Sequence, residues 1–157
     1  MAEQWLIDGY NLLHALSSQS PKKSSLTREK LFALVAEFAD FKNYSTLLVL
    51  DGVGDEGQLS AYQTVYLKVV FSQKVSADTY IEKYLYEHRK KQRLVVVTDD
   101  RAIANMGLGF GASVLSTAHF FERLKESRKE ESEFLQKEKT REHGFHRPFE
   151  DKLKKYE

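Results

Sequence analysis

The sequence has no cysteine, only two prolines and no long apolar run. Without cysteine, the chain can form neither a disulfide nor a zinc site built on thiolates. Its five histidines show no His-Glu-x-x-His spacing, so any metal must be held by oxygen ligands. No stretch approaches the roughly eighteen apolar residues of a membrane span, and the amino terminus does not resemble a signal peptide. We therefore expect a cytoplasmic protein that makes no membrane contact.

The chain also lacks an excess of charge of either sign. The chain has 24 Lys and Arg against 23 Asp and Glu, and the two signs stay balanced on both sides of residue 124. Nucleic-acid binding through counterion release alone is therefore not indicated, although local clusters can still contact phosphates.

Short apolar runs that end in aspartate are the most informative feature present. Four to six apolar residues closed by a turn or a helix start are typical of a buried parallel strand. Ligands of open α/β sheets gather outside the carboxyl ends of such strands, so these carboxylates predict one acidic pocket. The runs are Trp5-Leu6-Ile7-Asp8, Leu47-Leu48-Val49-Leu50-Asp51 and Leu94-Val95-Val96-Val97-Thr98-Asp99-Asp100.

Strands and helices are expected to alternate along the first 124 residues. The pattern predicts an α/β fold with a mostly parallel, doubly wound sheet of about five strands and right-handed crossovers. Glycines are expected to mark turns at Gly9, in a flexible loop over 52–57, and at Gly107, where a brief helix stops. The predicted strands are 4–8, 46–51, 66–71, 93–98 and 111–115, and the predicted helices are 27–42, 77–91, 101–106 and one that begins at Ser116 or Thr117.

Residues 125–157 are expected to form a separate, charged helical extension of the domain at 1–124. Residues 126–142 are mostly charged and predict a solvated helix. Gly144 is expected to break it, and Pro148 to begin a helix with Phe149, Leu153 and Tyr156 on one face. That face must dock either on the core or on a partner, and we expect a larger RNA or a ribonucleoprotein.

The acidic residues suit metal-dependent hydrolysis. Asn11 offers an amide beside Asp8, and the four-residue spacing of Asp78 and Glu82 places two carboxylates on one face of a helix. Mg²⁺ and Mn²⁺ prefer such oxygen ligands and could act on a phosphodiester from among Asp8, Asp78 and Asp100. Taken singly, each carboxylate has a structural alternative as a helix cap, a turn residue or a solvated side chain.

Four motifs in order resemble the YacP-like NYN domains, relatives of the PIN-domain ribonucleases. The resemblance spans about residues 4–124, and it implies a three-layer PIN-like α/β/α sandwich, Mg²⁺ or Mn²⁺ dependence and endoribonuclease activity. The motifs are Asp8-Gly9-Tyr10-Asn11, Leu50-Asp51, Ser76-Ala77-Asp78-x-x-Ile81-Glu82, and Val97-Thr98-Asp99-Asp100 followed by Gly109-x-Gly111-Ala112.

The resemblance also implies roles for single residues. Asp8, Asp78 and Asp100 match the acidic core, with Asn11 and Asp51 as supporting polar residues and Glu82 as an accessory ligand. Such domains often have serine in place of Asp99, whose carboxylate either shares the metal site or caps the next helix.

Contacts with RNA, expected to be single-stranded, are predicted on the pocket side of the sheet. Lys22, Lys23 and Arg101 are candidates for positioning phosphates, and Tyr10 for stacking on an unpaired base. The basic run over 88–93 closes a helix, where cations suit the helix dipole, and lies at the opposite edge of the sheet.

Two other functions fit parts of the pattern. A haloacid dehalogenase-type phosphohydrolase would have a second aspartate two residues after Asp8, where this chain has Tyr10. A noncatalytic RNA-binding or scaffold domain is the remaining alternative, but such a domain gains nothing evident from clustering unpaired acids.

Overall fold

The computed structural model describes the backbone of residues 3–19, 27–89 and 93–156, and the side chains of 3–16, 27–89 and 93–141. It confirms the α/β prediction. Five parallel strands form one sheet in the order β3-β2-β1-β4-β5. The strands are β1 (Gln4–Asp8), β2 (Ser45–Leu50), β3 (Leu67–Phe71), β4 (Leu94–Val97) and β5 (Ser113–Leu115).

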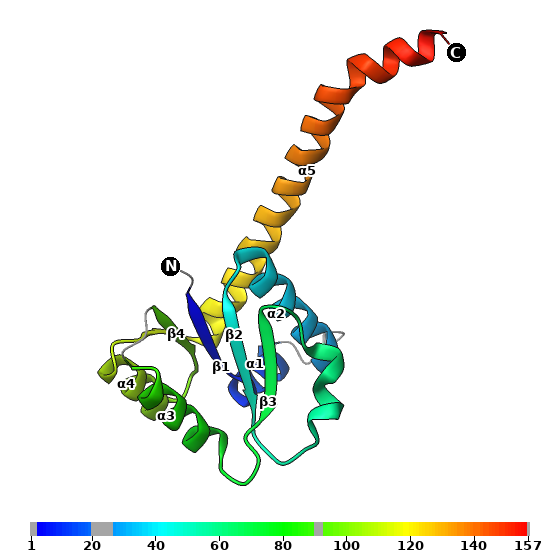
Figure 1. Ribbon diagram of the computed structural model, residues 1–157. Coiled ribbons are helices and arrows are strands. Elements are labelled where there is room, and N and C mark those ends of the chain that lie inside the picture. The colour runs from blue at the N-terminus through cyan, green and yellow to red at the C-terminus, as the bar shows by residue number, and fades with distance from the viewer. Residues whose placement is uncertain (1–2, 20–26, 90–92, 157) are drawn as a thin grey trace.

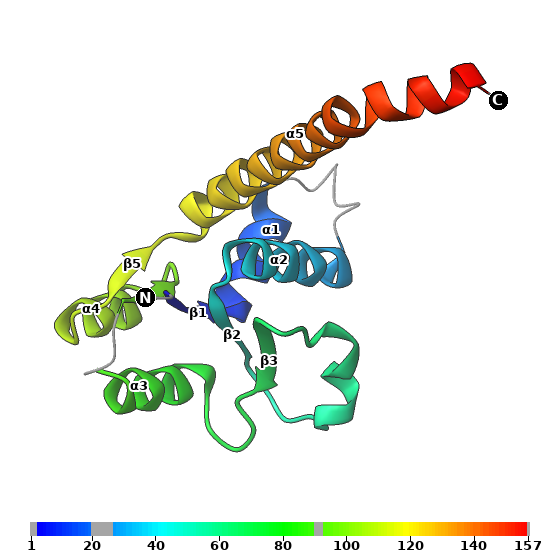
Figure 2. The same ribbon diagram turned by 45° about the horizontal axis from the view of Figure 1, so that its top comes forward.

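Helices cover both faces of the sheet, as Figure 1 and Figure 2 show. One apolar core joins the sheet to α1, α2 and α5 and contains Leu12, Phe32 and Phe120, and the other joins it to α3 and α4 through Ile81 and Ile103. The result is the predicted three-layer α/β/α sandwich. The helices are α1 (Gly9–Gln19), α2 (Arg28–Lys42), the 3₁₀ helix η1 (Glu56–Tyr62), α3 (Ala77–Glu87), α4 (Arg101–Gly109) and α5 (Thr117–Tyr156).

Side-chain caps set the starts of three helices. Thr27, Ser76 and Asp100 precede α2, α3 and α4, and each accepts a hydrogen bond from a backbone amide of the first turn. These amides have no partner within the helix, so a capping oxygen stabilises the helix by about 1 kcal/mol. Because α3 and α4 follow β3 and β4 through short connections, their first turns lie at the carboxyl edge of the sheet.

The structure differs from the sequence prediction at two glycines. Helix α1 begins at Gly9, where a turn was predicted. Gly9 packs closely against β2, since a Cβ at this position would lie 2.7 Å from the Val49 carbonyl oxygen. Helix α4 continues through Gly107, where a Cβ would lie 3.3 Å from Val114 Cγ2. Both glycines serve close packing, a requirement that depends on residues distant in sequence.

Two further expectations differ from the structure. The loop after β2 is shorter than predicted, because η1 begins at Glu56 with Asp55 as its cap. Helix α5 is continuous from Thr117 to Tyr156, so Gly144 does not break it and Pro148 does not begin a new helix. The helix also runs across the predicted boundary between residues 124 and 125. Within the described residues, no helix is long and apolar enough to cross a bilayer.

Candidate active site

The strand order places three strand ends around one point. β1 lies between β2 and β4 in the sheet. Helix α1, which follows β1, packs on one face of the sheet, and helix α4, which follows β4, packs on the other face. A crevice at such a switch point is where open α/β sheets bind ligands. Asp8 ends β1, Asp51 follows β2, and Asp99 and Asp100 follow β4.

Asp8 is buried, with 2% of its surface exposed. Its Oδ2 accepts hydrogen bonds from Asn11 Nδ2 at 2.7 Å and from Thr98 Oγ1 at 3.4 Å, and Oδ1 accepts one from the Asn11 amide at 3.3 Å. The Asn11 side chain reaches Asp8 because it lies in the first turn of α1, three residues after Asp8. The carboxylate is therefore held in one orientation by groups on α1 and on the segment after β4.

Asp51 enters the site from the end of β2, and Asp78 enters it from the start of α3. Asp51 Oδ1 accepts a hydrogen bond from the Ala77 amide at 2.9 Å, which ties the end of β2 to the first turn of α3. Asp78 is the next residue and stands in that first turn. The helix dipole favours a carboxylate at this position.

The adjacent residues Asp99 and Asp100 have different surroundings. Asp100 caps α4, with Oδ1 accepting from the amides of Ala102 at 2.8 Å and Ile103 at 3.1 Å, and it faces the same space as Asp8. Asp99 instead binds Thr117: its Oδ1 accepts from the Thr117 amide at 2.9 Å, and its Oδ2 accepts from the Thr117 hydroxyl. Of the pair, only Asp100 lines the site.

Together these residues surround a cavity of about 240 Å³. Four of its eight lining residues are aspartates, and none is lysine or arginine, so its electrostatic potential is negative. The lining residues are Asp8, Tyr10, Asn11, Asp51, Ser76, Ala77, Asp78 and Asp100.

Burial and crowding disfavour the charged forms of two of the acids. Burial raises the pKa of Asp8 above its ordinary 3.8, hydrogen bonds from Asn11 and Thr98 lower it, and the charges of Asp78 and Asp100 raise it further. Burial also raises the pKa of Asp78, with the charges of Asp100 and Asp51 in addition. A positive charge placed in the cavity would relieve this repulsion.

A family model of the YacP-like NYN domain matches residues 5–157. The chain belongs to this family. The NYN family is nuclease-like and RNA-related, and the match confirms the resemblance carried by the four motifs while extending it over α5.

Solved structures share the fold of this NYN domain. The crystal structure of Rae1 (YacP) from Bacillus subtilis is 21% identical and superposes with a TM-score of 0.68 over 98% of this chain and 91% of its own. The W164L mutant of the same protein is 20% identical, with a TM-score of 0.67 over 86% of this chain and 82% of its own. No protein with a curated description matches the chain.

Of the remaining predicted site residues, one lines the cavity, two are exposed outside its lining, and two lie outside the described residues. Tyr10 lines the cavity, and Arg101 is exposed at the first residue of α4, directly after Asp100. Glu82 is exposed on α3 and is not among the lining residues. Lys22 and Lys23 lie outside the described residues.

Thr98 belongs to the site of this NYN domain and was not predicted. Its hydroxyl donates to Asp8 and accepts from the Asp100 amide at 3.0 Å, so one buried side chain connects two of the acids. The sequence signals were a polar residue at the end of an apolar strand and its place in the motif Val97-Thr98-Asp99-Asp100. Within the described residues, no three His, Asp or Glu side chains converge closely enough to form a metal cage from protein ligands alone.

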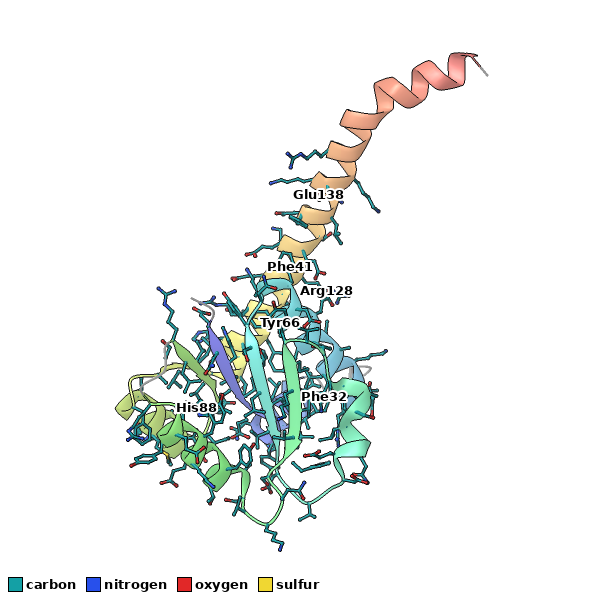
Figure 3. The ribbon with its side chains drawn as sticks, viewed as in Figure 1. Phe32, Phe41, Tyr66, His88, Arg128 and Glu138 are labelled. Atoms are coloured by element: carbon teal, nitrogen blue, oxygen red, sulfur yellow. The ribbon has the colours of Figure 1, made fainter. Side chains whose placement is uncertain are left out.

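The basic run at the end of α3 is engaged locally where it is described. His88 Nδ1 is 2.8 Å from the Tyr84 carbonyl oxygen, and Arg89 donates to the Tyr86 carbonyl oxygen at 2.6 Å with its guanidinium over the Tyr86 ring. Figure 3 labels His88 on this helix. These contacts with backbone carbonyls of the last turn agree with the expected role of the run in closing the helix.

Proposed function

We propose that this NYN domain is a Mg²⁺- or Mn²⁺-dependent endoribonuclease that hydrolyses single-stranded RNA at the acidic cavity. The observation that carries the proposal is the set of four aspartates, from three strand ends and one helix start, around a space lined by no cation. Family membership supports RNA as the substrate class.

The donor set fits a hydrated divalent cation. Asp8, Asp78 and Asp100 would hold it, with Asp51 beside them, because all four line one cavity and the pKa values of Asp8 and Asp78 are raised by burial and by neighbouring carboxylates. Mg²⁺ usually keeps several waters and takes one or two carboxylates, so a site wider than a closed protein cage suits it. When bound, such an ion supplies positive charge to a phosphodiester transition state and lowers the pKa of a water molecule.

The surrounding residues would orient the acids. Asn11 and Thr98 donate to Asp8 and keep its carboxylate from rotating, while the α4 amides fix Asp100 through Oδ1. Fixed groups need no reorganisation during the reaction, which is a main source of catalytic rate.

The rim of the cavity favours a single strand with accessible bases. The Tyr10 side chain lines the cavity and is 61% exposed. Val53 does not line the cavity, but it follows Asp51 by two residues and is 76% exposed. The loop that carries Val53 is held by Gln73, which donates from its amide to Gly52 O at 2.8 Å and from its side chain to Gly54 O at 2.9 Å. Exposed aromatic and apolar groups can contact unstacked bases, which a duplex would hide. Arg101 would contact a phosphate.

A cleavage assay tests the proposal. A mixed pool of single-stranded RNAs should be cut internally by the wild type with Mn²⁺, and cleavage should fall at least about a hundredfold in Asp8→Asn, in line with the loss of a major catalytic group. Glu122→Gln, which changes an exposed carboxylate on α5, is the matched control and should cleave as the wild type does. RNA binding without cleavage by the wild type would favour the noncatalytic alternative.

A further inference from the structure

Asp99 connects the start of α5 to the site. Both of its carboxylate oxygens accept hydrogen bonds from Thr117, one from the backbone amide at 2.9 Å and one from the hydroxyl. Thr117 is the first residue of α5 and is 2% exposed, so the contact is anchored in the core. Eighteen residues separate the two partners, which makes this a tertiary contact and not a local cap.

The same residue also sets the orientation of Asn11. The Asp99 amide donates to Asn11 Oδ1 at 3.1 Å, and Asn11 Nδ2 donates to Asp8 Oδ2 at 2.7 Å. A backbone N–H can only donate, so the oxygen of the Asn11 amide must face Asp99 and its nitrogen must face Asp8. A flipped Asn11 would place oxygen against oxygen at Asp8 and nitrogen against N–H at Asp99.

We propose that Asp99 is a positioning residue that holds the Asn11 amide, and through it the Asp8 carboxylate, and is not a metal ligand. The proposal rests on the proposed function for its kinetic consequences. The neighbouring Asp100 lines the cavity while both Asp99 oxygens are engaged by Thr117 outside it. Residues 98–100 have no regular secondary structure, and hydrogen bonds hold each of them: the Thr98 amide donates to the Leu115 carbonyl oxygen at 3.0 Å, and the Asp100 amide donates to Thr98 Oγ1 at 3.0 Å. At Asp99 itself, the contact with Thr117 is the one that restrains the residue through its side chain.

Three variants of the full chain separate positioning from metal binding. Asp99→Ala removes the contact with Thr117. Asp99→Asn keeps an oxygen that can accept from the Thr117 amide, and its nitrogen can donate to the Thr117 hydroxyl. Thr117→Val removes only the hydroxyl from a buried position of similar shape.

Cleavage of a short single-stranded RNA with Mn²⁺ is the first measurement. We expect Asp99→Ala to lower kcat by about tenfold or more with little change in KM, since a displaced catalytic group affects the reaction more than substrate binding. Asp99→Asn should recover most of the lost rate, and its Mn²⁺ concentration for half-maximal rate should stay that of the wild type. If Asp99→Asn is as impaired as Asp99→Ala and needs about tenfold more Mn²⁺, Asp99 is a ligand and the proposal is wrong.

A second measurement is independent of catalysis. In metal-free protein, the side-chain amide signals of Asn11 in ¹⁵N-correlated NMR spectra should shift or broaden in Asp99→Ala, less in Thr117→Val and least in Asp99→Asn. Unchanged Asn11 signals in Thr117→Val and Asp99→Ala would overturn the positioning role, and if Asp99→Ala fails to fold, Thr117→Val decides. A wild type that cleaves no RNA refutes the proposed nuclease, while the Asn11 signals still decide whether Asp99 positions this amide.

Discussion

Asp8 is the one ionisable side chain that is buried among the described residues. It gains three hydrogen bonds there, yet burial still raises its pKa, which means that the folded protein disfavours its charge. Such a residue contributes little to stability in the absence of a counter-charge, so its position is better explained by chemistry than by folding.

Replacement of Asp8 by asparagine should separate stability from function. A carboxyl whose folded pKa is raised contributes stability that is fully present below its unfolded pKa, near 3.8, and is lost as the pH rises through the folded pKa. In a chelator, Asp8→Asn should therefore gain stability relative to the wild type as the pH increases over that range, reaching on the order of 1 kcal/mol or less. Thermal melting from pH 3 to 7 measures this difference. A variant that is several kcal/mol less stable at neutral pH would show that Asp8 is structural.

Asp78 tests whether the acids share one cation. Its pKa is raised by burial and by the charges of Asp100 and Asp51, so a cation bound between these groups must interact electrostatically with the Asp78 carboxylate. Calorimetric titration of wild type with Mn²⁺ should show binding that weakens at least about tenfold in Asp78→Asn, the loss expected for one carboxylate ligand. Equal stoichiometry and affinity in the two proteins would contradict a shared site.

At the scale of elements, α1 packs closely against β2 at Gly9. A Cβ on Gly9 would approach backbone as well as the side chains of Leu48 and Leu50, so Gly9→Ala should lower the free energy of unfolding by about 1–3 kcal/mol, as overpacking does. Gly109→Ala is the matched control, because nothing lies within 4 Å of the added methyl group at the end of α4. Urea unfolding of both variants compares them. Equal stabilities would show that position 9 accommodates a Cβ and that close packing does not require glycine there.

These glycines show which parts of the fold could be predicted. The strands and the capped helices α2 and α3 follow from apolar runs and from Thr27 and Ser76, which are local signals. Gly9 and Gly107 were assigned to turns because the close approach of Val49 or Val114 is a tertiary fact. The site follows the same rule. The sequence predicts that aspartates at strand ends gather in one pocket, but it does not predict that Asp99 binds Thr117 while Asp100 lines the cavity.

The outer edge of β3 is closed by side chains. Gln63 Oε1 accepts from the Val69 amide at 2.9 Å, and Gln63 Nε2 donates to the Val69 carbonyl oxygen at 2.8 Å. The Thr64 hydroxyl accepts from the Leu67 amide at 3.0 Å, and the Thr64 backbone amide donates to the Leu67 carbonyl oxygen at 2.9 Å. Gln63 and Thr64 thus occupy hydrogen-bonding groups that would otherwise be available to a strand of another molecule.

Gln63→Ala should uncover this edge. The substitution removes the two hydrogen bonds to Val69 and a third, from Gln63 Nε2 to the Leu59 carbonyl oxygen at 3.2 Å. We expect a loss of about 1–2 kcal/mol in stability and increased self-association, because an open edge strand pairs with other chains. Gln58→Ala, at an exposed glutamine in η1, is the control. Sedimentation velocity over a concentration series measures association, and a Gln63→Ala protein as monomeric as the control would show that the edge is protected by other means.

For the whole molecule, α5 has a packed half and a projecting half. Phe120, Leu124 and Ser127 are buried against the core, and farther along Glu130 pairs with Lys42 at 2.5 Å and Phe134 packs edge-on against Phe41. Figure 3 shows Phe41 and Arg128 where α2 and α5 meet and Glu138 beyond that contact. Figure 1 shows the helix continuing past the amino-terminal edge of the sheet, away from the carboxyl ends that form the acidic cavity.

Truncation after Glu142 tests the predicted docking role of the tail. The stripe of Phe149, Leu153 and Tyr156 lies outside the described side chains, but the backbone of α5 carries it away from the core. A short helix is marginal in water without tertiary or intermolecular contact, and the sequence predicts that a larger RNA or a ribonucleoprotein covers this stripe, with the core as the alternative. The truncated protein should keep its melting temperature and its cleavage of a short RNA, and should bind the larger partner more weakly.

Truncation after Glu126 is the control. It removes the contacts of Ser127, Glu130 and Phe134 and should lower the melting temperature by several degrees. If the shorter deletion already unfolds the protein or abolishes cleavage of the short RNA, the stripe belongs to the fold and the docking role is wrong.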